Sequence, residues 1–263
     1  MYAKDLLKIL EEDAPLSFSD EMVALSGGRD NSGIIIDGGG SSDKIMFSLD
    51  FSLSAVEAAR DAECGLMVTH HPAIYYPLSR IAGNSQTETA VYAAIKGGLS
   101  VISMHLNLDS AREGIDANLA AMFGKVMPTA LFNTPGGAAY GHIADTDGRS
   151  LAELSRKYSE ETGSERVCFY GAGDCIPEKA AVFCGAGMDM EELYAAKRAG
   201  CGMAVSSDIK HYVLSEAAFL NIAVLSVTHY SAENYGFNKF YKKTEKKLQN
   251  LAEVFYHTDR ELL

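Results

Sequence analysis

The sequence has no tryptophan, only six prolines, and a shortage of positive charge. Its 23 lysines and arginines are outnumbered by 35 acidic residues, which gives a formal net charge of −12. Nucleic-acid binding needs a basic face toward the phosphates, so this balance argues against a nucleic-acid partner. An acidic chain is compatible with a cation site, although many ordinary proteins are acidic as well.

Cysteine is also scarce: the five cysteines form no C-x-x-C pair. An odd number without close spacing argues against a disulfide framework and against a cysteine-type zinc finger, and we expect buried thiols. No apolar stretch approaches the roughly 18 residues of a membrane span, and the N-terminus lacks the apolar segment of a signal peptide. The sequence therefore predicts a cytoplasmic protein without a membrane partner.

Short apolar runs alternate with amphipathic segments along most of the 263 residues. This alternation predicts an α/β fold with buried strands. Strands are expected at 34–36, 44–49, 64–69, 99–104, 180–184, 202–205 and 222–227. Helices are expected at 3–13, from a cap at Ser52 or Ser54 to Arg60, and at 87–96, 115–123, 150–162, 189–199, 212–220 and 234–252.

A glycine run at 38–40 invites comparison with phosphate-binding loops. It fits neither the G-x-x-x-x-G-K-[ST] pattern nor G-x-G-x-x-G followed by a helix. A plain hairpin turn is the favoured interpretation.

Histidines follow three of the expected strands. His70 and His71 follow the run that ends at Thr69, His105 follows the run 99–104, and His229 comes after the run 222–227. Ligands and metals are held at the carboxyl ends of strands in α/β sheets. Histidines at strand ends in both halves of the chain therefore suggest one shared site.

An internal repeat supports this interpretation. Residues 62–71 lie over 199–208, and 101–105 lie over 225–229 when the terminal histidines are aligned. A carboxylate follows each aligned histidine by four positions. The repeat predicts two similar α/β halves, an internal duplication packed around a metal site, with a small α+β connecting region. The expected divisions are a first half at 1–131, the connecting region at 132–178 and a second half at 179–263.

A mixed set of imidazoles and carboxylates suits Zn, Fe, Mn, Co or Ni. Carboxylates also bridge paired metals, which acidify a bound water and hold a phosphate or carbonyl oxygen. A lone histidine at a strand end is more often structural, but matching positions in two repeats favour ligands. His70 and His71 would point to opposite faces of an extended strand, so a shared site requires a bend near Pro72. The predicted metal ligands are His70, His71, Asp109, His229 and Glu233.

Weaker candidates surround this set. His105 could orient a ligand or simply pack at its strand end. Asp208, Lys210 and His211 occupy the repeat position of His70 and His71, so they could line the cleft; the alternative is a solvated helix start with Asp208 as N-cap. His142 and His257 lack partner spacing, which favours structural or surface roles. The absence of a G-x-S-x-G elbow argues against a Ser-His-Asp enzyme.

Several motifs spread over nearly the whole chain stand out: VTHHP (68–72), HLNLDSAREGIDANLA (105–120), CGAG (184–187), SSDIKH (206–211), THYSAE (228–233) and, more weakly, DNSG (30–33). In these motifs the sequence resembles the Nif-three-like (YbgI-type) family of dinuclear metal-binding proteins, often labelled GTP cyclohydrolase I type 2 homologues. The resemblance implies the same five metal ligands, two α/β halves around two divalent transition-metal ions (Zn, Fe or Mn) and a toroidal homohexamer. Departures from the family pattern occur at Ser206-Ser207-Asp208 and Gly141-His142.

Two functions are consistent with these features. The first is a metal-dependent hydrolase of the GTP cyclohydrolase I type 2 kind, acting on a nucleotide or another small molecule. The second is a non-catalytic metal-binding or scaffold protein that interacts with other proteins. Open metal positions would favour the hydrolase, whereas a site closed by protein atoms would favour the structural role.

Overall fold

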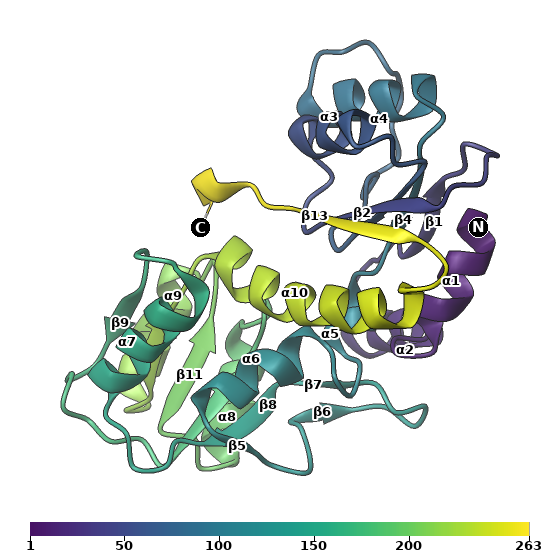
Figure 1. Ribbon diagram of the computed structural model, residues 1–263. Coiled ribbons are helices and arrows are strands. Elements are labelled where there is room, and N and C mark those ends of the chain that lie inside the picture. Colours follow the sequence, from purple (N-terminus) through teal and green to yellow (C-terminus); the bar gives the residue numbers. More distant parts are fainter. Residues whose placement is uncertain (263) are drawn as a thin grey trace. The chain divides into compact units, whose positions relative to one another are not determined.

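The computed structural model describes residues 1–262 and confirms the α/β class (Figure 1). The chain forms two compact units. Unit 1 contains residues 1–111 and 237–259, and unit 2 contains residues 112–236 and the C-terminal residues from Arg260. Among the described residues, no helix combines the length and apolar character needed to cross a membrane.

Unit 1 is built on a five-stranded sheet in the order β1-β4-β3-β2-β13. The central strands β2, β3 and β4 run parallel, β13 joins β2 in parallel, and β1 is antiparallel to β4. The strands are β1 Gly33–Ile36, β2 Lys44–Ser48, β3 Leu66–Thr69, β4 Ser100–Ser103 and β13 Glu253–His257. The helices are α1 Ala3–Glu11, α2 Ser17–Ser26, α3 Leu53–Asp61, α4 Gln86–Lys96 and α5 Leu106–Asp109.

Helices α3 and α4 cover one face of this sheet (Figure 1). Their small apolar residues, such as Ala59 and Ala94, pack in one core with Met46 and Met67 of the strands. Helix α3 begins where expected, because the Ser52 hydroxyl accepts a hydrogen bond from the Ala55 amide at 3.1 Å. Both β3 and β4 are buried along their whole length, which explains why they appear in the sequence as short apolar runs.

Unit 2 contains a six-stranded sheet in the order β5-β8-β10-β11-β12-β9 and a two-stranded sheet of β6 and β7. Strands β10, β11 and β12 are parallel, whereas β8 is antiparallel to β10 and β9 to β12. The strands are β5 Lys125–Val126, β6 Phe132–Asn133, β7 Ala139–Tyr140, β8 His142–Asp145, β9 Cys168–Tyr170, β10 Lys179–Val182, β11 Met203–Ser206 and β12 Ala223–Ser226. The helices are α6 Ile115–Phe123, α7 Leu151–Thr162, α8 Met190–Arg198, α9 His211–Phe219 and the short 3-10 helix Arg260–Leu262.

Each unit has three parallel strands joined by helices, with an antiparallel strand beside the third of them. The series β2-α3-β3-α4-β4 in unit 1 has the same order as β10-α8-β11-α9-β12 in unit 2. This is the order that the internal repeat predicts. The duplication itself stays a prediction.

The last long helix, α10 (His229–Leu248), begins earlier than the expected 234 and ends before 252. Thr228 explains the early start, because its hydroxyl accepts a hydrogen bond from the Ser231 amide at 3.1 Å and so caps the helix. The residues that follow form β13, a strand that the sequence pattern did not reveal. Residues 237–248 of α10 and β13 belong to unit 1, so the compact units differ from the ranges 1–131, 132–178 and 179–263.

Two further expectations fail in unit 1. The glycine run 38–40 is not a hairpin turn, because β1 pairs with β4, while β2 pairs with β3 and β13. Helix α2 was also missed, because no helix was expected between the end of the first one at residue 13 and the strand at 34–36; α2 starts two residues after Pro15.

Candidate metal centre

Four of the predicted site residues gather at the carboxyl ends of β3 and β4 in unit 1. Nε2 of His70 lies 3.6 Å from Oδ1 of Asp109, and both side chains are buried. One ring nitrogen each of His70, His71 and His105 lies within 4.8 Å of the others. We call His70, His71, His105 and Asp109 the histidine cluster.

The backbone bends directly after β3. Such a bend is needed if the adjacent residues His70 and His71 are to reach the same site. The amides of His70 and His71 both donate to the carbonyl oxygen of Leu49, each at 3.0 Å. An extended strand would direct these two amides to opposite sides. As a result the two rings lie on the same side, with centroids 4.8 Å apart.

Each imidazole of the histidine cluster is held through Nδ1 by an oxygen atom. Carboxylate and carbonyl oxygens only accept hydrogen bonds, so Nδ1 carries the proton and Nε2 is the nitrogen that each ring offers to a metal. The partners are the Met104 carbonyl for His70 at 2.8 Å, Asp50 for His71 at 2.6 Å and Asp30 for His105 at 2.6 Å.

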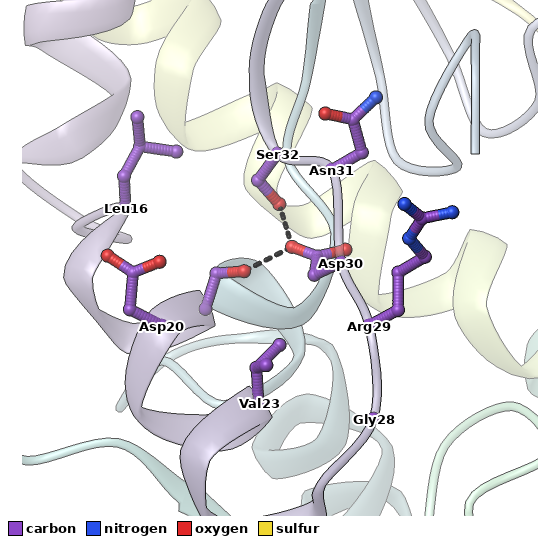
Figure 2. Close-up of a pocket in the computed structure, with 9 residues that line it drawn as sticks. Leu16, Asp20, Val23, Gly28, Arg29, Asp30, Asn31 and Ser32 are labelled. Atoms are coloured by element: carbon purple, nitrogen blue, oxygen red, sulfur yellow. Dashed lines mark hydrogen bonds between the residues drawn. The ribbon is translucent and has the colours of Figure 1, made fainter. Parts of the chain in front are cut away.

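Asp30 is the most strongly held of these anchors, and it forms part of the wall of a surface pocket (Figure 2). Besides His105 it accepts hydrogen bonds from the hydroxyls of Ser19 and Ser32. Burial by itself would raise the pKa of Asp30, but the hydrogen bonds, above all that from His105, lower the pKa to about 2. Asp30 is therefore ionised, as an anchor for a protonated Nδ1 must be.

In unit 2, His229 and Glu233 lie one turn apart at the start of α10. Nε2 of His229 is 3.0 Å from Oε2 of Glu233, and Nδ1 of His229 is 2.7 Å from Oδ2 of Asp208. Asp208 follows β11, so a carboxylate from a neighbouring strand end again fixes the ring. We call Asp208, His229 and Glu233 the α10 cluster.

Gly185 approaches this cluster so closely that no larger residue fits. A Cβ atom at position 185 would clash with Oε1 of Glu233 and would lie 3.0 Å from Nε2 of His229. The residue also has a φ of +56°, in the left-handed region that favours glycine. The carbonyl oxygen of Gly185 accepts hydrogen bonds from the Ser207 amide at 2.9 Å and the Ser206 hydroxyl at 3.1 Å, which fix the turn.

The other candidates of this region have different roles. Lys210 forms an ion pair with Asp189 at 2.6 Å and also contacts the Tyr212 hydroxyl at 3.2 Å, on an exposed surface. His211 is the exposed first residue of α9. Asp208 is not the N-cap of α9, since Lys210 occupies that position. Of these three residues, Asp208 is the one held against a predicted ligand.

The two histidines expected to be structural are both paired with a carboxylate. His257 lies in unit 1 with Nε2 3.1 Å from Oδ1 of Asp259. His142 lies in unit 2, and its Nδ1 is 2.6 Å from Oδ2 of the fully buried Asp116.

The sequence analysis gave no role to Asp30, Asp50, Asp116 and Gly185, although all but Asp50 lie within the motifs that carry the family resemblance. A usable signal existed for Asp50, because it follows a predicted strand just as His70 and His105 do. Asp30 precedes β1, and only the antiparallel pairing of β1 with β4 brings it to the end of β4 beside His105. Such neighbours depend on strand order, which residue spacing does not encode.

The histidine cluster and the α10 cluster have the chemistry of a metal site. Imidazole nitrogens and carboxylate oxygens suit divalent transition metals, and anchored rings are the usual arrangement of metal-binding histidines. Buried groups of this kind could hold a metal ion.

Comparisons with known proteins agree with this fold. A family model described as Duf34/NIF3 (NGG1p interacting factor 3) matches residues 1–261. The chain is 26% identical over 254 residues to a "GTP cyclohydrolase 1 type 2 homolog" of Clostridium acetobutylicum, with 95% of this chain and 91% of the relative covered. A relative of the same name from Methanocaldococcus jannaschii is 26% identical over 251 residues, with 91% and 93% covered.

A solved structure of similar fold is a Bacillus cereus protein related to NIF3. It matches with a TM-score of 0.83 at 14% identity and covers 98% of this chain and 97% of that chain. The resemblance drawn from the motifs is thus confirmed over nearly the whole length. With its two α/β units and the histidines at their strand ends, the chain belongs to the Duf34/NIF3 family.

Proposed function

We propose that the protein binds two divalent transition-metal ions through His70, His71, Asp109, His229 and Glu233, and that it hydrolyses a nucleotide or similar small molecule. The main support is the anchoring of the rings. His71 and His229 are each fixed through Nδ1 by an aspartate, at 2.6 and 2.7 Å. A histidine so held presents Nε2 with its orientation and tautomer already set, which lowers the cost of binding a metal.

The ligand types support a hydrolytic rather than a purely structural site. Closed structural zinc sites are usually rich in cysteine, whereas this set contains imidazoles and carboxylates only. When bound, a pair of divalent ions would lower the pKa of a water molecule and stabilise negative charge on a phosphate or carbonyl oxygen. Within unit 2, the turn at Gly185 lies so close to Glu233 and His229 that a Cβ there would clash with Glu233.

Metal content of the purified, untagged protein tests the first part of the proposal. After incubation with Zn, Mn or Fe and removal of excess metal, elemental analysis should give about two ions per chain. His71→Ala and Glu233→Ala should each reduce this value. His257→Ala is the matched control, because its imidazole is bonded to Asp259 outside both clusters and its loss should leave the metal content unchanged.

Hydrolysis tests the second part. The metal-loaded protein is incubated with GTP and with simple phosphodiesters, and release of formate or phenol is followed. Turnover that is lost in His71→Ala supports a hydrolase. Two bound ions without turnover of any of these compounds would instead indicate a metal-binding or scaffold role. Metal content unchanged in both ligand variants would refute the site itself, and the native mass measured alongside tests the implied hexamer.

A further inference from the structure

Unit 2 contains a second histidine–aspartate pair, at the same edge of the sheet as the α10 cluster. Strand β8 runs antiparallel to β10, and His142 pairs in register with Val182, the last residue of β10. His142 therefore lies at the carboxyl edge of the parallel strands. Gly141, the residue before His142, lets the chain pass close to Phe183. It has a φ of +71°, and a Cβ there would lie 2.7 Å from the Phe183 ring.

Asp116 holds His142 in a single orientation. Its Oδ2 accepts hydrogen bonds from the His142 backbone amide at 2.9 Å and from Nδ1 at 2.6 Å, and its Oδ1 accepts one from the Cys184 amide at 2.9 Å. The two amides can only donate, and a carboxylate oxygen accepts, so Nδ1 of His142 is the donor in the third bond. Nδ1 of His142 then carries a proton, and Nε2 is the ring nitrogen that can gain or lose one.

The same carboxylate connects His142 to the α10 cluster. By binding the Cys184 amide, Asp116 fixes the residue that precedes Gly185, a position with no room for a Cβ beside Glu233 and His229. One carboxylate thus holds both the imidazole of His142 and the turn before Gly185. His257 is different, because its partner Asp259 also accepts hydrogen bonds from the hydroxyls of Ser54 at 2.8 Å and Ser52 at 3.3 Å, near the start of α3.

We propose that His142 is the general acid of the hydrolytic site, with Asp116 as its positioning residue; this rests on the proposed function. In hydrolysis, the oxygen of water forms a bond to phosphorus or carbon, and the bond to the leaving oxygen or nitrogen breaks with its electron pair. Nε2 of His142 donates a proton to that leaving atom, and the proton lost by water restores His142. An aspartate on Nδ1 stabilises the imidazolium form that such a step requires.

The test compares two phosphodiesters that differ in leaving group. Diphenyl phosphate releases a basic phenolate that needs a proton, whereas bis(p-nitrophenyl) phosphate releases a weakly basic phenolate that does not. His142→Asn retains a donor toward Asp116 but has no group at the position of Nε2. In metal-loaded protein it should reduce kcat for diphenyl phosphate by about 100-fold or more, with a much smaller effect on the nitrophenyl ester and with unchanged metal content.

A purely structural role would affect both esters equally, and that result would overturn the inference, as would full activity of His142→Asn on both. Imidazole in the buffer should restore turnover of diphenyl phosphate by His142→Ala, which a folding defect would not allow. His257→Asn is the control and should behave as wild type. If metal-loaded wild type cleaves neither ester nor GTP, the proposed function fails and this inference fails with it.

A measurement without turnover addresses the anchoring directly. Nitrogen-15 NMR of the histidine rings should show Nδ1 of His142 protonated in wild type, and Asp116→Asn should shift this resonance. A His142 ring that carries its proton on Nε2 alone would contradict the assignment even if the protein is a hydrolase.

Discussion

The histidine cluster of unit 1 and the α10 cluster of unit 2 use the same anchoring chemistry on different supports. In unit 1 the histidines follow two neighbouring strands, and the anchor Asp30 is almost fully buried. In unit 2 the ligands come from one helical turn, and the anchor Asp208 has a side chain that is 63% exposed. The first cluster is therefore organised by hydrogen bonds that are buried or partly buried. In the second cluster the anchoring bond is exposed, and the Gly185 backbone lies close to the ligands.

The comparison shows that an imidazole can be fixed in two ways, by a buried carboxylate anchor or by backbone that lies close to the ring. A buried carboxylate keeps its orientation because few alternative partners compete for it. An exposed carboxylate exchanges its partner with water, so the α10 cluster depends more on the shape of the turn around it.

The largest expected effect is that of Gly185→Ala. The added Cβ clashes with Glu233, and the alanine must keep the positive φ of Gly185. We therefore expect the free energy of unfolding to fall by about 2–4 kcal/mol and the metal content to fall as well. Gly200→Ala is the matched control. Gly200 also has a positive φ, +74°, but nothing lies within 4 Å of its added Cβ, so only about 1 kcal/mol should be lost. Urea unfolding and elemental analysis measure both; equal losses would show that the contact with Glu233 has no effect.

Removing the anchor charge should affect the two clusters unequally. Asp50→Asn should weaken metal binding by about 10–100-fold, because Asp50 fixes His71 with a side chain that is 30% exposed. Asp208→Asn should have a smaller effect, since water already competes with His229 for the exposed carboxylate of Asp208. Competition with a chelating dye measures both affinities. A stronger effect at Asp208 would reverse the comparison drawn between the clusters.

The part of α10 that belongs to unit 1 is tied to Asp13 by two lysines, and this gives a pH-dependent effect. Lys243 and Lys247 lie 2.9 and 2.8 Å from its oxygens. Burial by itself would raise the pKa of Asp13, but the two ammonium groups lower it below the ordinary value. Asp13 therefore stabilises the fold above its unfolded pKa, and this contribution disappears as the pH falls through the lowered folded pKa.

Asp13→Asn should accordingly cost about 1 kcal/mol at neutral pH, and the difference from wild type should vanish in acid. Asp61→Asn removes a largely exposed ion pair with Arg60 and should have almost no effect at neutral or acid pH. Urea unfolding at several pH values measures both variants. If the stability lost in Asp13→Asn relative to wild type grows as the pH falls, the predicted direction of the pH dependence is wrong.

The smallest effect concerns Cys64 and Cys201, two free cysteines at matching positions of the internal repeat. Both are buried, and burial raises the pKa of each thiol to about 11. Iodoacetamide at pH 8 should therefore leave both unlabelled in the native protein, whereas the exposed Cys168 reacts. Mass spectrometry after a short reaction distinguishes the sites. Equal labelling of Cys64 and Cys168 would show that the Cys64 thiol is not protected in solution.

Much of the candidate site was predictable because its chemistry is local in sequence. His70 and His71 follow a short apolar run, and so does His105, since buried parallel strands are apolar along their whole length. Asp109 lies four residues after His105, one turn away on α5. That metal ions bind these residues stays a prediction.

Other features depend on contacts between distant parts of the chain. The start of α10 was predicted too late because Thr228, which follows the expected strand 222–227, was not recognised as the helix cap. Helix propensity is weak and caps decide the boundary, so His229 and Glu233 were not recognised as neighbours on one helix.

The sequence by itself determined the α/β class, most of the strands and the histidines at their ends, because periodicity and apolar runs reflect burial directly. Only the tertiary structure decided the anchors. Strand order brings Asp30 to His105 and Asp50 to His71, and the antiparallel register of β8 brings His142 to the carboxyl edge. Hydrogen bonds between residues far apart in the chain form only when the strands that carry them pair, and no local pattern specifies that pairing.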